Sequence, residues 1–156
     1  MWEALFTAAN LVAMACWAVL VLARRTPVTH SALMYCGVAL LCLAYAVLLI
    51  GLVTGLLDGA KVTGAGQAGF TSISGVRNIF LSDGGVVVGW VHYLALDLFT
   101  GLWIARDADA KSFPRLWQGP VLVLTFLAGP LGLITWLALR EPAARRAAGP
   151  RSKVLK

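Results

Sequence analysis

Asp97 and His92 are the two side chains whose chemical type and position could support a reaction. Both lie in the apolar stretch Gly89–Trp103, and Asp97 is close to the middle of a longer apolar window, Gly84–Ala105. A carboxyl group at the centre of a membrane is costly, so we expect Asp97 to face other helices and to have a partner there. In apolar surroundings a protonated Asp97 is a candidate general acid, and His92 is a candidate base.

Helical geometry separates these two residues. At about 100° per residue, His92 and Asp97 lie about 140° apart around one helix. They are therefore not expected to pair directly, and would instead flank a ligand or contact different neighbouring helices. Both also have a purely structural interpretation, as hydrogen bonds that hold helices together. The residues that share a stripe with Asp97 are Trp90, Tyr93 and Gly101, and those that share one with His92 are Leu96, Phe99 and Trp103.

Residues of other apolar windows could complete a site around Asp97. Pro130 removes a backbone donor and should kink its helix, which would free carbonyl groups near Thr125. Its neighbours Gly129 and Gly132 permit close approach of another helix. These features are compatible with a pocket beside Asp97, and equally with packing alone. The candidate polar partners on the first two windows are Asn10, Thr7 and Tyr45.

The whole chain has the composition of a small polytopic membrane protein. Of its 156 residues, 60% are apolar and 13% are charged, and the mean hydropathy is +0.82. A soluble domain carries about a quarter charged residues and about half apolar ones. A soluble enzyme, a nucleic-acid-binding module and a disordered chain are therefore excluded.

Four windows are apolar over the roughly 20 residues that a helix needs to cross a bilayer. They are Leu5–Ala23, Leu33–Leu57, Gly84–Ala105 and Leu116–Leu139. A spanning segment must satisfy its own backbone hydrogen bonds, and no alternating strand pattern is present, so the predicted fold class is all-α. We expect a four-transmembrane-helix bundle over residues 1–140, followed by a basic, disordered tail over residues 141–156.

The long connection between the second and third windows has two parts. Its first part, Gly59–Gly69, is rich in glycine and is expected to be a flexible loop. Its second part is too short and too polar to span, and is predicted to form an amphipathic helix that lies at the membrane interface or folds over the end of the bundle. The apolar residues at helical spacing there are Phe70, Ile73, Val76, Phe80 and Leu81.

The net charge of +6 indicates contact with lipid headgroups and not with nucleic acid. The thirteen Lys and Arg residues lie between the apolar windows and in the tail. With four spans both termini share one side, and the basic tail favours the cytoplasm for it. Glu3 before the first window and Arg24-Arg25 after it point the other way. The three cysteines, Cys16, Cys36 and Cys42, lie inside apolar windows and suggest neither disulfides nor a metal site.

The run Trp90–Gly101, WVHYLALDLFTG, resembles the abscisic-acid-deficient-four-like membrane proteins. The likeness extends through Trp103–Asp107, to the pattern Thr125–Leu133 and to Val76–Phe80, and it covers nearly the whole chain. Plant members of that family take part in neoxanthin formation and act on violaxanthin in a plastid membrane. The Ala-, Arg- and Gly-rich composition suggests a bacterial chain, so the membrane location and an isoprenoid-type ligand transfer better than that substrate.

The resemblance implies a membrane protein of carotenoid or isoprenoid metabolism that binds a polyene and could isomerise it. Opening an epoxide to an allenic alcohol needs an acid at the oxygen and a base at a neighbouring C–H, and Asp97 and His92 are the candidates for these roles. Trp90, Tyr93, Phe99 and Trp103 would line the polyene, with Thr125, Asn10 and Tyr45 as further candidates for the binding site.

Other functions stay open at this stage. The chain could be a non-catalytic scaffold or an accessory subunit of a larger membrane complex, and a small transporter is a further alternative. No cofactor is evident, while a bound carotenoid or lipid is compatible with the pattern. The expected partners are membrane lipids, a carotenoid-like small molecule, and further copies of the chain or a larger complex. The expected location is the bacterial inner membrane.

Overall fold

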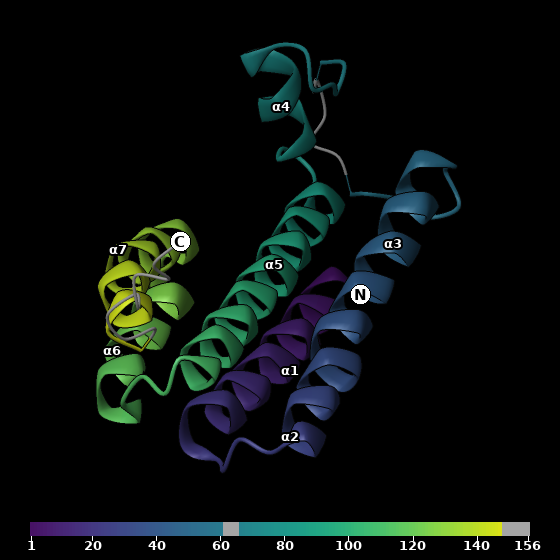
Figure 1. Ribbon diagram of the computed structural model, residues 1–156. Coiled ribbons are helices and arrows are strands. Elements are labelled where there is room, and N and C mark those ends of the chain that lie inside the picture. The colour runs from purple at the N-terminus through teal and green to yellow at the C-terminus, as the bar shows by residue number, and fades with distance from the viewer. Residues whose placement is uncertain (61–65, 148–156) are drawn as a thin grey trace, which may run out of the picture.

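The computed structural model describes the backbone of residues 1–60 and 66–147, and the side chains of residues 1–60 and 66–141. The described part is all-helical, as predicted (Figure 1). The elements are α1 (Trp2–Leu22), α2 (Pro27–Ala32), the π-helical segment η1 (Leu33–Ala39), α3 (Leu40–Val53), α4 (Ile73–Ile79), α5 (Asp83–Ala110), α6 (Arg115–Leu127) and α7 (Gly129–Ala147).

Three helices are long and apolar enough to cross a membrane. They are α1, the continuous rod of α2, η1 and α3 (Pro27–Val53), and α5. The second rod begins earlier than its apolar window because Thr26 caps it: the Thr26 side chain accepts a hydrogen bond from the Thr29 amide, and Pro27 fits the first helical turn. The helix α5 is the central one, since 56% of its most apolar window is buried, against 22% and 28% for the other two.

The three spans run in alternating directions, and polar contacts mark both ends. At one end, the Trp2 indole donates to the Asp58 carbonyl at 3.1 Å, and Gly84 packs against Gly59. At the other end, Arg25 pairs with Asp109. We call these the Trp2 end and the Arg25 end. The helix α4 lies beyond the Trp2 end (Figure 1).

The fourth predicted span, Leu116–Leu139, is not one helix. It is divided at Ala128, whose backbone leaves the helical region (φ −156°, ψ 82°), and α7 begins at Gly129. Proline lacks the amide that the interior of a helix needs, whereas it fits a first turn. Pro130 therefore starts a new helix, where the sequence predicted a kink within one helix.

The two halves of this window fold back on each other as an α6–α7 hairpin beside α5 (Figure 1). A Cβ atom on Gly132 would lie only 2.5 Å from the Thr125 amide nitrogen, so the helices meet closely at their junction. The chain then returns to the Arg25 end, where the Trp136 indole donates to Asp107 at 3.0 Å. Of the predicted tail, Glu141–Ala147 continues α7, and residues 148–156 lie outside the described residues.

The hairpin reaches only to the middle of α5. With 13 residues, α6 is about 20 Å long. The same number of residues separates Asp97 from the end of α5 at Ala110, and Gly129 at the tip of the hairpin indeed lies against Asp97.

The long connection contains a helix shorter than the sequence predicts. Ser72 caps α4 by accepting a hydrogen bond from the Gly75 amide at 3.0 Å, and the helix ends at Ile79. Phe70 and Ile73 are exposed, and Phe80 is half exposed, with one edge of its ring against Gly89 of α5. Part of the predicted loop, residues 61–65, lies outside the described residues.

Candidate functional site

The carboxyl group of Asp97 lies inside the protein, against the tip of the α6–α7 hairpin. Its residue is 9% exposed, and its buried Oδ2 atom has no hydrogen-bond partner among the described residues. A Cβ atom on Gly129 would lie 2.7 Å from the carboxyl carbon, so glycine leaves the space that the carboxyl occupies. A buried polar atom without a partner is costly, and such atoms call for an explanation such as a ligand or a reaction.

The first turn of α7 adds a favourable field to this position. Pro130 has no amide N–H, and the Leu131 and Gly132 amides donate to the Ala128 carbonyl, so what α7 contributes here is the positive end of its helix dipole. The Tyr93 hydroxyl, one turn before Asp97 on the same face, is close to both the carboxyl and the Gly129 backbone. The tip therefore gathers one carboxyl, one hydroxyl and the start of a helix within a largely apolar bundle.

Aromatic side chains extend this face of α5 toward the Trp2 end. The rings of Trp90 and Tyr93 stack with their centroids 5.6 Å apart, and Phe6 of α1 lies 5.7 Å from Trp90. The Trp90 indole donates to Asn10 Oδ1 at 3.0 Å. Asn10 is thus the partner of Trp90, and not of Asp97 as the sequence suggested. Trp90, Tyr93 and Asp97 do share one face, in agreement with the helical geometry.

The remaining candidates lie elsewhere. His92 faces α3, where its ring is 5.2 Å from the ring of Tyr45, so neither residue contacts Asp97. Thr125 is fully buried beside Gly132 and donates to the Val121 carbonyl at 2.8 Å. Phe99 and Trp103 line a different depression on the opposite side of α5.

An apolar groove of about 270 Å³ runs between α1 and α6, and Asp97 is not among its lining residues. The Trp17 ring forms its inner wall, lies edge-on to Phe126 at 5.5 Å, and packs against Gly101, one turn after Asp97. No sequence pattern marks this groove, because its walls come from helices about a hundred residues apart; the glycine at position 101 is the one signal of a close contact. The lining residues are Met14, Trp17, Ala18, Val21, Leu22, Val123 and Phe126.

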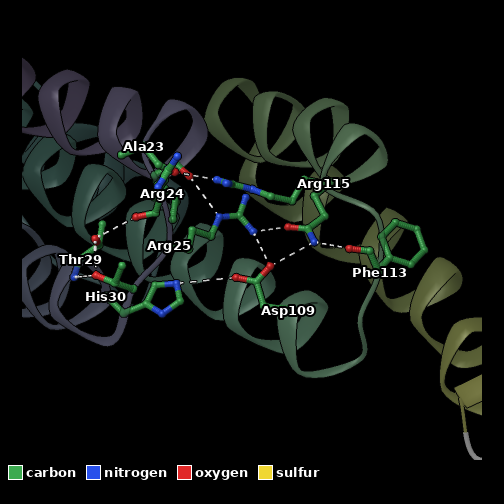
Figure 2. A network of polar contacts seen from close by, with 11 residues as sticks. Ala23, Arg24, Arg25, Thr29, His30, Asp109, Phe113 and Arg115 are labelled. Atoms are coloured by element: carbon green, nitrogen blue, oxygen red, sulfur yellow. Dashed lines mark hydrogen bonds and ion pairs between the residues drawn. The ribbon is translucent and has the colours of Figure 1, made fainter.

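A polar network at the Arg25 end is the other feature that the sequence does not reveal (Figure 2). The Arg25 side chain, only 4% exposed, pairs with Asp109 at 3.1 Å and donates to the Gln118 side chain. Burial lowers the pKa of the Arg25 guanidinium from its ordinary value, while the charge of Asp109 opposes that shift. Arg115 donates to the Ala23 carbonyl at 2.6 Å. The network joins the α1–α2 connection to the α5–α6 connection.

The described residues contain no cluster of three or more His, Cys, Asp or Glu that could hold a metal ion. Three helices are apolar enough to span a membrane, and the buried carboxyl of Asp97 lies against the tip of the hairpin. These features define a helical membrane protein with a polar group in its interior.

The family comparison agrees with this class. The model of the ABA4-like family, described as ABA DEFICIENT 4-like, matches residues 4–136, and the chain belongs to that family. The matched region includes α1 from residue 4, α2 to α6 and the first part of α7, with Asp97 and Gly129. No curated protein and no solved structure matches the chain.

Proposed function

We propose that the protein binds a carotenoid-like polyene or a related isoprenoid in the α1–α6 groove, and isomerises it at Asp97. The observation that carries the proposal is the buried Asp97 Oδ2 without a partner among the described residues. The apolar groove is linked to it through Trp17, a groove residue that packs against Gly101, one turn after Asp97 on α5. Membership of the ABA4-like family supports an isoprenoid as the ligand, by the resemblance to neoxanthin-forming members.

An isomerisation by proton movement needs one proton delivered and one removed. A single carboxyl group can do both: one oxygen donates its proton to the ligand, and the other accepts the proton lost from a neighbouring C–H. The carboxyl then ends in its starting state, so the step balances without a second base. This mechanism replaces His92, which faces Tyr45 on another side of α5. Tyr93 orients the carboxyl or the ligand from one turn away.

Asp97→Asn tests the proposal, because it keeps the shape of the side chain and removes its acid chemistry. The matched control is Asp83→Asn, the same change at an exposed position of the same helix. Each protein is purified in mild detergent from a carotenoid-producing host, and the extracted isoprenoids are compared by chromatography. We expect wild type and Asp83→Asn to carry both ligand and isomer, and Asp97→Asn to lose the isomer by at least about 100-fold, the usual contribution of an acid–base group.

Two results would contradict this function. If the wild-type preparation contains no isoprenoid, the proposed ligand is wrong. An unchanged product in Asp97→Asn would favour a non-catalytic scaffold, in which Asp97 serves only the packing of α5 against α7. The second conclusion requires that Asp97→Asn is folded, judged by helix content and elution volume.

The charge distribution supports an orientation that differs from the one expected for four spans. With three spans and a hairpin that enters and leaves on one side, Met1 and residue 147 lie on opposite sides of the membrane. Among residues 1–60 and 66–141, six of the seven Lys and Arg residues lie at the Arg25 end, and Arg77 alone lies at the other. Basic residues accumulate on the cytoplasmic side, so we assign the Arg25 end to the cytoplasm. The six are Arg24, Arg25, Arg106, Lys111, Arg115 and Arg140.

The short helix α4 fits a position at the opposite membrane surface. Its neighbourhood exposes Phe70, Ile73 and Phe80, while Ser72 and Asn78 supply polar groups. An amphipathic segment of this kind gains by placing its apolar side chains at the headgroup boundary.

A further inference from the structure

Two depressions adjoin on the outer face of the rod α2–η1–α3 and α5, at the Arg25 end. The first, of about 350 Å³, is lined by Pro27, His30, Ser31, Met34, Tyr35 and Arg106. The second, of about 310 Å³, is lined by Met34, Phe99, Leu102, Trp103, Arg106 and Asp107. Both contain Met34 and Arg106, so together they form one groove, which we call the Arg106 groove. It has a polar mouth and a mainly apolar floor, in which Asp107 is the one carboxylate and is paired with Lys111 and Arg140.

The groove is separate from the Asp97 site. Arg106 lies nine residues after Asp97, which places the two side chains about 180° apart around α5. The ligand of the Arg106 groove therefore need not be the ligand of the Asp97 site.

Arg106 takes no part in the ion pairs around it in the described part of the chain. In the part of the chain with described side chains, no hydrogen bond or salt bridge involves its guanidinium. The nearby acids are both engaged. Asp107 accepts from Lys111 at 2.5 Å and from Arg140 at 3.0 Å, and Asp109 pairs with Arg25.

Two neutral donors line the mouth with Arg106. Ser31 and Tyr35 are exposed and carry hydroxyl groups. His30 also lines the mouth, but its buried Nε2 atom faces Asp109 Oδ2 at 4.0 Å. Two hydroxyl donors beside one unpaired guanidinium suit the oxygens of a phosphate group, which accept charge-assisted hydrogen bonds. A free carboxylate of the protein does not compete for them, since Asp107 and Asp109 have partners.

The floor of the groove suits a hydrocarbon chain. Phe99 and Trp103 are partly exposed along the spanning part of α5, and the Arg140 guanidinium lies 5.6 Å from the Trp103 ring. Met34 belongs to η1, whose π-helical turns are wider than α-helical ones and occur often at functional sites. The apolar floor continues from the polar mouth toward the middle of the helix, as a chain continues from its headgroup.

We propose that the Arg106 groove binds one anionic phospholipid, with its phosphate at Arg106, Ser31 and Tyr35 and an acyl chain along Met34, Phe99 and Trp103. The polar mouth lies at the end of the spanning helices, at the depth of lipid headgroups, and its unpaired positive charge complements an anionic head. This binding goes beyond the isomerisation proposed for Asp97 and does not depend on it.

Native mass spectrometry of the detergent-purified protein tests the assignment. The protein is titrated with phosphatidylglycerol and, separately, with phosphatidylcholine of the same acyl chains. We expect a preference for phosphatidylglycerol, and Arg106→Gln should weaken its binding about tenfold, as the loss of a hydrogen bond to a charged group does. The matched control is Arg24→Gln, which removes the same charge from an exposed position at the same end, outside the groove.

Each outcome decides the question. Equal losses in Arg106→Gln and Arg24→Gln, or no preference between the two lipids in the wild type, would overturn the proposal, because general surface charge would then explain the binding. Phe99→Ala should weaken lipid binding without changing the preference for the anionic head. Displacement of the lipid by millimolar inorganic phosphate alone would assign the mouth to a soluble phosphate compound and overturn the lipid. If Arg106→Gln does not fold, the double variant Ser31→Ala, Tyr35→Phe should reduce the preference instead.

Discussion

At the scale of single residues, the site depends on a pair in which one partner has no side chain. Gly129 lies where any Cβ atom would overlap the Asp97 carboxyl. The same logic applies one turn later on α5, where Gly101 makes room for the Trp17 ring. Two glycines thus allow α1, α5 and α7 to meet around one carboxyl, and a methyl group at either position must push a partner away.

Gly129→Ala tests this packing against a control on the neighbouring helix. The added methyl should lower the apparent Tm in detergent by about 5 °C, since overpacking a core costs about 1–3 kcal/mol and each kcal/mol shifts Tm by about 2–4 °C in a chain of this size. Gly119→Ala adds the same methyl on α6, where a Cβ meets nothing within 4 Å, and should leave Tm unchanged or raise it. Thermal unfolding followed by helix content measures both; equal Tm changes would refute the contact.

The sequence predicts this site in part. Helical spacing on one element places Trp90, Tyr93 and Asp97 together and separates His92 from them, because the geometry of a single helix is known in advance. The partners across helices do not follow from spacing. Gly129 contacts Asp97, and Trp17 contacts Gly101 one turn later on α5; both partners come from elements that lie far away in the sequence. Asn10 bonds to Trp90 and not to the carboxyl.

At the scale of elements, three spans follow from the length of their apolar windows, and the fourth window does not. A spanning helix and a hairpin that enters the membrane beside α5 need the same apolar composition, so hydropathy cannot distinguish them. The local signal is the pair Gly129-Pro130, which the sequence interpretation took as a kink. The extended backbone of Ala128 turns that kink into a complete break, and contacts with Asp97 and Thr125 stabilise the folded-back arrangement.

The connection between elements at the Arg25 end makes a second prediction. Arg25→Gln should lower the apparent Tm by about 5 °C, because the buried guanidinium joins the α1–α2 connection to Asp109 and Gln118, and a lost charged hydrogen bond costs about 1.5–3 kcal/mol. Its neighbour Arg24 is exposed, so Arg24→Gln should change Tm by less than about 1 °C. Thermal unfolding of both variants in the same detergent is the measurement. A similar loss for both would show that the network adds nothing beyond surface charge.

At the scale of the whole molecule, the hairpin changes the topology. Four spans would place residue 69 in the long connection and residue 147 at the end of α7 on the same side of the membrane. Three spans and a hairpin place them on opposite sides, because α6 and α7 enter and return at the Arg25 end, where Trp136 and Arg140 contact Asp107. Among the residues with described side chains, the excess of Lys and Arg at that end agrees with the orientation proposed above, in which this end faces the cytoplasm.

Reporter fusions distinguish the two arrangements. A green fluorescent protein fused after residue 147 should fluoresce, since it folds in the cytoplasm, and an alkaline phosphatase inserted after Gly69 should be active, since it needs the oxidising outer side. The exchanged pair of reporters, phosphatase after residue 147 and fluorescent protein after Gly69, is the control and should be silent at both positions. If both fusions report the same side, the chain has four spans, and the contact between the hairpin tip and Asp97 is wrong. Opposite sides with the reverse signs would keep the hairpin and place the basic end outside, against the distribution of charge.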